Sequence, residues 1–168
     1  MADQNATDIL KSAILLEKRG RAFYKKIAKQ TEYPAVKEFF NMMAAEEETH
    51  VAMLTEQYRS YQESGHFKST DYGTDDAFTG VATKVLSDKL KGEITAADFE
   101  AAAIGAAMSM EQRAIDLYAD RAKTATDEHE KALYVWLADW ERGHLTFLAE
   151  VDQELREEVW NDNSFWPM

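Results

Sequence analysis

Apolar residues recur at helical spacing along four long segments of the chain. Ile104, Met108, Ile115 and Tyr118, for example, follow one another at intervals that keep them on one helix face, with Glu111 among them. Proline and glycine are scarce, so little interrupts these segments. The sequence therefore predicts four long helices, at roughly 8–30, 34–60, 96–123 and 128–160.

Local signals mark where three of these helices begin. Pro34 suits the first turn of the second helix, where its missing N–H would be unpaired anyway. Thr95 and Asp98 have the spacing of a capping box at the start of the third helix. Asp127 and Glu130 have the same spacing before the fourth.

The segment 61–95 separates the second and third helices and contains four glycines, with a short helix expected at about 81–91. A long crossover of this kind joins two hairpins in some four-helix bundles. The sequence thus predicts an all-α fold, a bundle of two helical hairpins (8–60 and 96–152) joined by a crossover that contains a short helix. We expect one domain over residues 1–168.

Glutamate, tyrosine and histidine residues repeat at a constant offset of 94 positions, in the pairs Glu17 and Glu111, Tyr24 and Tyr118, Glu47 and Glu141, His50 and His144. Residues i and i+3 of a helix share a face, so each Glu-x-x-His aims a carboxylate and an imidazole at one point. Glu17 and Glu111 can meet these groups across the bundle.

The repeated polar residues fall within apolar stripes, such as the one from Met43 to Leu54. Buried charges need a counter-charge, and four carboxylates balance two divalent cations. Mixed oxygen and nitrogen donors suit iron or manganese better than calcium or magnesium, with zinc as a further candidate. The alternative, two solvent-exposed Glu–His pairs, fits the apolar neighbours poorly. The predicted metal ligands are Glu17, Glu47, His50, Glu111, Glu141 and His144.

Neighbouring residues carry weaker signals. Glu46 and Glu48 flank Glu47 but are out of phase with the apolar stripe, so a solvated surface is expected for both. The four tryptophans are expected in the core or at a subunit interface rather than beside a cofactor. The aromatic C-terminal segment 160–167 is expected to dock on its own bundle or on a neighbour.

The pattern Glu-x6-Tyr followed by Glu-x2-His, present twice, resembles the ferritin-like di-iron carboxylate proteins and most of all the rubrerythrin group, over nearly the whole chain. The resemblance implies two iron ions bridged by Glu47 and Glu141. It makes Glu17 and Glu111 terminal ligands, and His50 and His144 the remaining ligand of each iron. Tyr24 and Tyr118 would orient ligand carboxylates, with ordinary core packing as the alternative.

Two features depart from that group. Typical rubrerythrins append an iron domain bound by four cysteines, whereas this chain has no cysteine, so a separate protein is expected to supply electrons. Rubrerythrins also usually carry a further carboxylate one turn after the Glu of the third helix. Ala114 holds that position here, and its counterpart is Gly20. Small residues there leave an open coordination site or allow close helix packing.

Composition limits the class of protein. The net charge of −12 disfavours nucleic acid as a partner. The sequence contains no apolar stretch of about 20 residues that would span a membrane. With no signal peptide at its start, the chain is expected to be a cytoplasmic protein.

Three functions are weighed on this basis. The leading one is an enzyme of oxidative stress, a homodimer that reduces hydrogen peroxide or dioxygen at the di-iron site. The second is oxidation and storage of iron in a hollow shell, and the third is a binding scaffold without catalysis.

Overall fold

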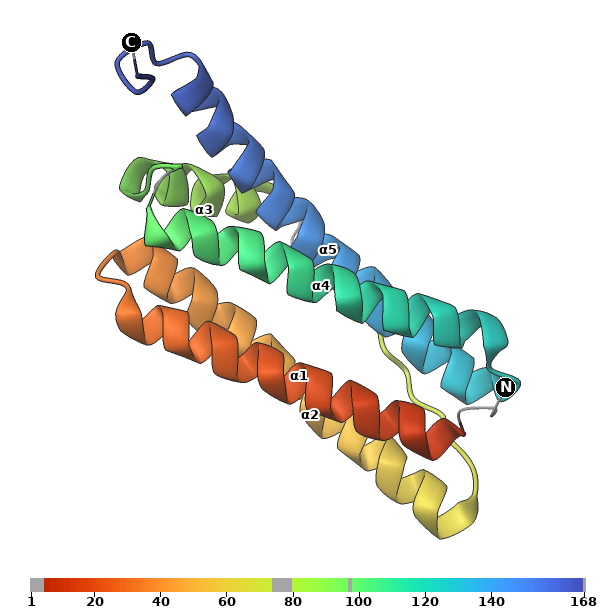
Figure 1. Ribbon diagram of the computed structural model, residues 1–168. Helices are drawn as coiled ribbons and strands as arrows, with labels where there is room; N and C mark the ends of the chain where they lie inside the picture. Colours follow the sequence, from red (N-terminus) through yellow and green to blue (C-terminus); the bar gives the residue numbers. More distant parts are fainter. Residues whose placement is uncertain (1–4, 74–79, 97, 168) are drawn as a thin grey trace.

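The computed structural model describes residues 5–73, 80–96 and 98–167, and these residues form five α-helices without a strand (Figure 1). The helices are α1 (Ala6–Gln30), α2 (Pro34–Ser64), α3 (Gly80–Glu93), α4 (Phe99–Thr124) and α5 (Glu128–Trp160). α1 packs against α2 and α4 against α5, while the short α3 contacts α2 and α5. The predicted bundle of two hairpins, with a short helix in the crossover, is confirmed.

Side-chain caps explain two of the helix starts. Asn5 accepts a hydrogen bond from the backbone N–H of Asp8 (2.9 Å) at the start of α1. Asp127 accepts from two backbone N–H groups at the start of α5, as its sequence signal predicts. The prediction for α4 is three residues early. Asp98 does accept from the N–H of Thr95 (2.9 Å), but the helix itself begins at Phe99.

The start of α2 is capped from another helix. Pro34 occupies the first turn, as predicted, and Tyr33 supplies no side-chain cap. Instead the carboxylate of Glu93, the last residue of α3, accepts from the N–H groups of Ala35 (2.9 Å) and Val36 (3.2 Å). This contact fixes α3 against the beginning of the first hairpin.

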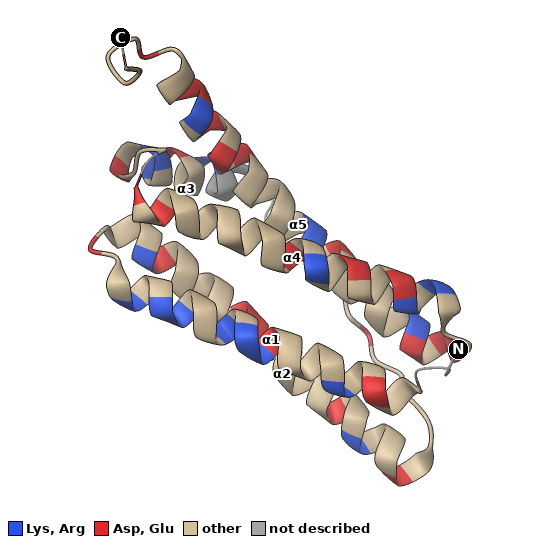
Figure 2. Ribbon diagram, viewed as in Figure 1, with Lys and Arg blue, Asp and Glu red and all other residues tan. Residues whose placement is uncertain are grey.

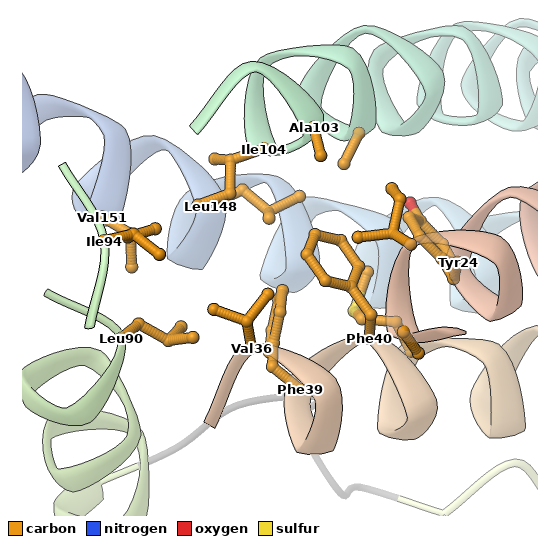
Figure 3. Packing of buried hydrophobic residues seen from close by; sticks show 14 of the residues in the cluster. Tyr24, Val36, Phe39, Phe40, Leu90, Ile94, Ala103, Ile104, Leu148 and Val151 are labelled. Carbon is orange, nitrogen blue, oxygen red and sulfur yellow. The ribbon is translucent and has the colours of Figure 1, made fainter. Parts of the chain in front are cut away.

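The apolar core is divided into two clusters. One contains the aromatic pair Phe39 and Phe40 and lies at the end of the bundle that α3 covers (Figure 3). The other contains Leu10 and Leu133 and lies at the opposite end. Along each of the four long helices, the predicted metal ligands fall between residues of the two clusters. The polar residues therefore occupy the middle of the bundle.

Charged residues of both signs cover the helices, and basic residues gather along α1 (Figure 2). Within the described parts of the chain, no helix combines the length and the apolar character needed to cross a lipid bilayer. At the C-terminal end of α5, Trp160 is 75% exposed. Trp166 packs edge-on against it and donates its indole N–H to the carbonyl of Val159 (3.1 Å). The aromatic tail thus folds onto the last turn of α5.

Candidate metal centre

The six predicted ligands come from four helices and meet in the middle of the bundle. Each is buried, the most exposed being Glu47 at 4%. Their donor atoms form two groups of four, and the atoms of a group lie within 4.8 Å of one another. One group is Glu17, Glu47, His50 and Glu141, and the other is Glu47, Glu111, Glu141 and His144. Glu47 and Glu141 belong to both groups, which is the arrangement that two neighbouring ions with shared ligands require.

Both imidazoles turn the same ring nitrogen towards the carboxylates. Nδ1 of His50 lies 3.0 Å from Oε1 of Glu141 and 3.3 Å from Oε2 of Glu17. Nδ1 of His144 lies 3.0 Å from Oε2 of Glu141 and 3.7 Å from Oε1 of Glu111. The two oxygens of Glu141 therefore face different histidines, as a carboxylate between two ions would.

The two tyrosines of the repeated pattern donate hydrogen bonds across the bundle. The hydroxyl of Tyr24, on α1, donates to Oε1 of Glu111 on α4. The hydroxyl of Tyr118, on α4, donates to Oε1 of Glu17 on α1. Burial and the nearby carboxylates raise the pKa of both phenols well above the usual value, so they stay protonated and act as donors. In Glu17 the other oxygen, Oε2, faces Nδ1 of His50, whereas in Glu111 the oxygen that accepts from Tyr24 is also the one near Nδ1 of His144.

The electrostatics of the site reflect four carboxylates crowded in a buried space. Burial and the charge of Glu141 raise the pKa of Glu111 to about 8, partly offset by His144. Burial and the charges of Glu17 and Glu141 raise the pKa of Glu47 well above its usual range. Burial alone would lower the pKa of His50, but the charges of Glu141 and Glu17 raise it to about 10. Without cations, protons therefore neutralise the cluster.

One carboxylate, in contrast, is held in its charged form. Burial raises the pKa of Glu141, but the charge of His50 and the hydrogen bond from His144 outweigh burial and place the pKa well below its usual range. Its Oε1 is buried and accepts no hydrogen bond from any described residue, although His50 Nδ1 is only 3.0 Å away. An unsatisfied carboxylate oxygen beside an imidazole nitrogen is the donor pair that a metal ion would satisfy. The donor set fits two divalent cations.

Comparison with known proteins agrees with this geometry. The rubrerythrin family model matches residues 8–151. The chain belongs to the rubrerythrin family. It is also similar to the solved structure of a hypothetical protein from Pyrococcus furiosus, with 28% sequence identity, a TM-score of 0.64 and coverage of 94% of each chain. No curated protein matches the sequence. Membership of the rubrerythrin family implies a di-iron site, and the buried cluster fits a metal site.

The position at which rubrerythrins usually place a further carboxylate borders a cavity. Ala114 lines a small cavity of about 20 Å³ together with Gly20, Leu16, Met110 and ligand residues. A Cβ atom added at Gly20 would lie 3.4 Å from the carboxyl carbon of Glu47. The two small residues therefore leave room for about one water-sized molecule beside Glu47.

Sequence reasoning missed one polar residue at this rubrerythrin-type site. Glu48 is exposed as expected, but the side chain of Glu46 is only 23% exposed. Its carboxylate contacts Nε2 of His144 and accepts from the indole N–H of Trp140 (3.1 Å). Glu46 and Trp140 are themselves separated by the offset of 94 positions. Because the offset joins unlike residues here, the repeat itself gave no signal for Glu46.

Two of the four tryptophans, Trp136 and Trp140, lie beside a predicted ligand, and Trp136 also packs against the core as expected, whereas Trp160 and Trp166 are exposed. The rings of Trp136 and Trp140 lie edge-on to the imidazole of His50, with centroid distances of 5.6 Å and 6.2 Å. Tyr72, in the crossover, stacks on Trp136 (5.2 Å). The indole of Trp136 therefore contacts both His50 and the crossover.

Proposed function

We propose that the protein is a di-iron oxidoreductase that reduces hydrogen peroxide or dioxygen, with peroxide as the preferred substrate. The observation that carries the proposal is the pair of four-residue groups that share Glu47 and Glu141 in a buried site. Membership of the rubrerythrin family supports iron as the metal. Manganese and zinc are the alternatives that metal analysis would decide.

The proposed ligand roles follow from membership of the two groups. Glu47 and Glu141 would each bind both ions, because each belongs to both groups. Glu17 and His50 would complete one ion, and Glu111 and His144 the other. The phenols of Tyr24 and Tyr118 would hold the terminal glutamates in place by donating to one oxygen of each.

Two bound ferrous ions would supply one electron each, and with two protons they convert one hydrogen peroxide molecule into two water molecules. The residues of the chain would admit and confine the oxidant. The cavity beside Gly20 and Ala114 suits a small molecule, and Leu16 and Met110 give it an apolar lining. Such a lining limits access of bulk water and larger peroxides to the site.

Electrons would come from a separate donor protein, because the chain has no cysteine that could bind iron in the way of the four-cysteine domain of typical rubrerythrins. We further propose a homodimer in the cytoplasm, by resemblance to other rubrerythrins. Sedimentation tests the assembly, since a large hollow shell would favour iron storage over peroxide reduction.

The test of the proposed reaction is anaerobic loading with iron(II), followed by mixing with one equivalent of hydrogen peroxide in a stopped-flow spectrometer. The wild-type protein should consume peroxide and become oxidised at a rate that depends on bound iron. The double variant Glu47→Ala and Glu141→Ala should lose this reaction, because each ion would lose both of its shared ligands.

A matched control removes two carboxylates that neighbour these ligands on the same helices. Glu48 and Asp139 are exposed and pair only with surface cations among the described residues. The variant Glu48→Ala and Asp139→Ala should therefore react like the wild type. Normal peroxide consumption by the Glu47 and Glu141 variant would overturn the proposal. Rapid oxidation by dioxygen with no reaction towards peroxide would favour iron oxidation and storage instead.

A further inference from the structure

Glu46 links the two hairpins beside the proposed metal centre. It lies on α2 next to Glu47, and its partners His144 and Trp140 lie on α5. Oε2 of Glu46 contacts Nε2 of His144 and accepts from the indole N–H of Trp140 at 3.1 Å. The same carboxylate oxygen therefore contacts both the imidazole and the indole N–H. The side chain of Glu46 is mostly shielded from solvent.

This contact determines how His144 faces the site. An imidazole that donates from Nε2 to a carboxylate presents the lone pair of Nδ1 on its opposite side. Nδ1 of His144 points at Glu141 (3.0 Å) and Glu111 (3.7 Å), where the ion of this group would lie. A carboxylate on the outer nitrogen fixes the ring orientation and strengthens the imidazole as a metal donor.

The other half of the site lacks this support. Trp140 occupies the position equivalent to Glu46, and its N–H donates to Glu46 itself. The ring of His50 lies edge-on against the indoles of Trp136 and Trp140. Both ion pairs of His50 use Nδ1, and no carboxylate of the described residues pairs with its Nε2. The two imidazoles therefore have different surroundings, although their inner contacts are alike.

We propose that Glu46 is a positioning residue that orients His144 for metal binding and so makes the two metal positions unequal, the His144 position being the tighter one. The proposal rests on the proposed metal centre. It extends that function by assigning a role to a residue outside the ligand set and an order to the loading of the two positions.

The test is a variant cycle that measures cobalt(II) binding at each position separately. His50→Ala keeps the group that contains His144, and His144→Ala keeps the group that contains His50. Adding Glu46→Ala to the His50→Ala protein should weaken cobalt(II) binding by about 10- to 100-fold, the range found when such outer partners are removed. Adding it to the His144→Ala protein should change binding by less than about threefold.

Glu48→Ala is the matched control, because it removes a carboxylate from the same helix that pairs, among the described residues, only with Arg21 and Lys25 at the surface. It should leave binding unchanged in both backgrounds. Equal weakening by Glu46→Ala in the two backgrounds would overturn the proposal, because a general effect on packing or charge acts on both positions. Absence of weakening in the His50→Ala background would also overturn it.

A second measurement uses the otherwise intact protein loaded with two equivalents of ⁵⁷Fe(II). Its Mössbauer spectrum should resolve two ferrous environments, and Glu46→Gln should alter only one of them. Changes in both environments, or in neither, contradict the proposal. If the wild-type protein fails to bind two ions per chain, the proposed function itself fails. If it binds two ions that respond equally to Glu46→Gln, only the inequality of the positions fails.

Discussion

At the scale of single residues, each tyrosine of the repeated pattern supports a glutamate of the other hairpin. Tyr24 donates to Glu111, and Tyr118 donates to Glu17. These bonds join α1 to α4, the two helices that contribute one glutamate each to the site. The tyrosines therefore couple the position of a ligand to the packing of the two hairpins.

We predict that Tyr118→Phe lowers both stability and metal affinity. Glu17 would lose a donor in a buried site, which costs about 1–3 kcal/mol. Metal affinity should fall by about tenfold or more, because the glutamate is no longer oriented. Thermal unfolding of the metal-free protein and cobalt(II) titration measure the two effects.

Tyr134→Phe is the control for this prediction. The Tyr134 hydroxyl is buried beside Tyr118 but has no hydrogen-bond partner among the described residues. Its removal should leave metal affinity unchanged and should not destabilise the protein. Equal losses in the two variants would show that Tyr118 acts only through packing.

The sequence predicted which six residues meet in the middle of the bundle because a fixed helical phase governs their positions. Glu47 and His50 share a face by spacing alone, and the offset of 94 supplies their counterparts. The sequence did not predict the contacts of Glu46, because its partners lie on a different helix. Its phase points away from the apolar stripe on α2, and only the approach of α5 brings His144 and Trp140 to it.

At the scale of helices, α3 is attached to the first hairpin by an acidic cap. Glu93 accepts from Ala35 and Val36, two N–H groups at the start of α2 that have no intrahelical partner. The sequence indicated a short helix in the crossover, but its docking could not be predicted, since a cap from a distant residue leaves no local spacing signal.

We predict that Glu93→Ala destabilises the protein without affecting the metal centre. Loss of a helix cap costs about 0.5–2 kcal/mol. For a protein of this size, Tm should fall by a few degrees, at about 2–4 °C per kcal/mol. Differential scanning calorimetry measures the change, and iron stoichiometry should stay the same.

The control is Glu32→Ala, which removes an exposed carboxylate close to the same helix start. It should shift Tm much less than Glu93→Ala. A similar shift in both variants would mean that net charge, rather than the cap, causes the change.

At the scale of the whole molecule, the buried glutamates and histidines of the four long helices meet between two apolar clusters. The sequence predicted this architecture because each of the four long helices has an apolar stripe that a Glu, or a Glu-x-x-His pair, interrupts near its middle. It did not predict that the C-terminal aromatic residues would pack mainly on one another and the end of α5. Aromatic content indicates burial but does not specify the partner.

The charge balance of the site predicts how the stability of the metal-free protein changes with pH. Burial raises the pKa of Glu111 from 4.5 to about 8, and nearby carboxylates raise that of His50 from 6.5 to about 10 despite burial. Both groups bind protons more tightly when folded, so their stabilisation is lost as pH rises through these values. The Tm of the metal-free protein should therefore fall between pH 5 and pH 9.

Metal ions compete with these protons, so the stabilisation that they provide should grow over the same pH range. Calorimetry with and without iron(II), under anaerobic conditions, measures the difference between the two Tm values at each pH. A difference that shrinks as pH rises would contradict this account of the site.

The most direct test of the central claim is the iron(II) stoichiometry of the wild type and two single variants. Glu141 belongs to both groups of ligands, whereas Glu17 belongs to only one. After anaerobic loading and desalting, the wild type should retain two ions per chain, Glu17→Ala should retain one, and Glu141→Ala should retain neither. Retention of a single ion by the wild type, or equal losses in the two variants, would contradict a centre of two ions with shared ligands.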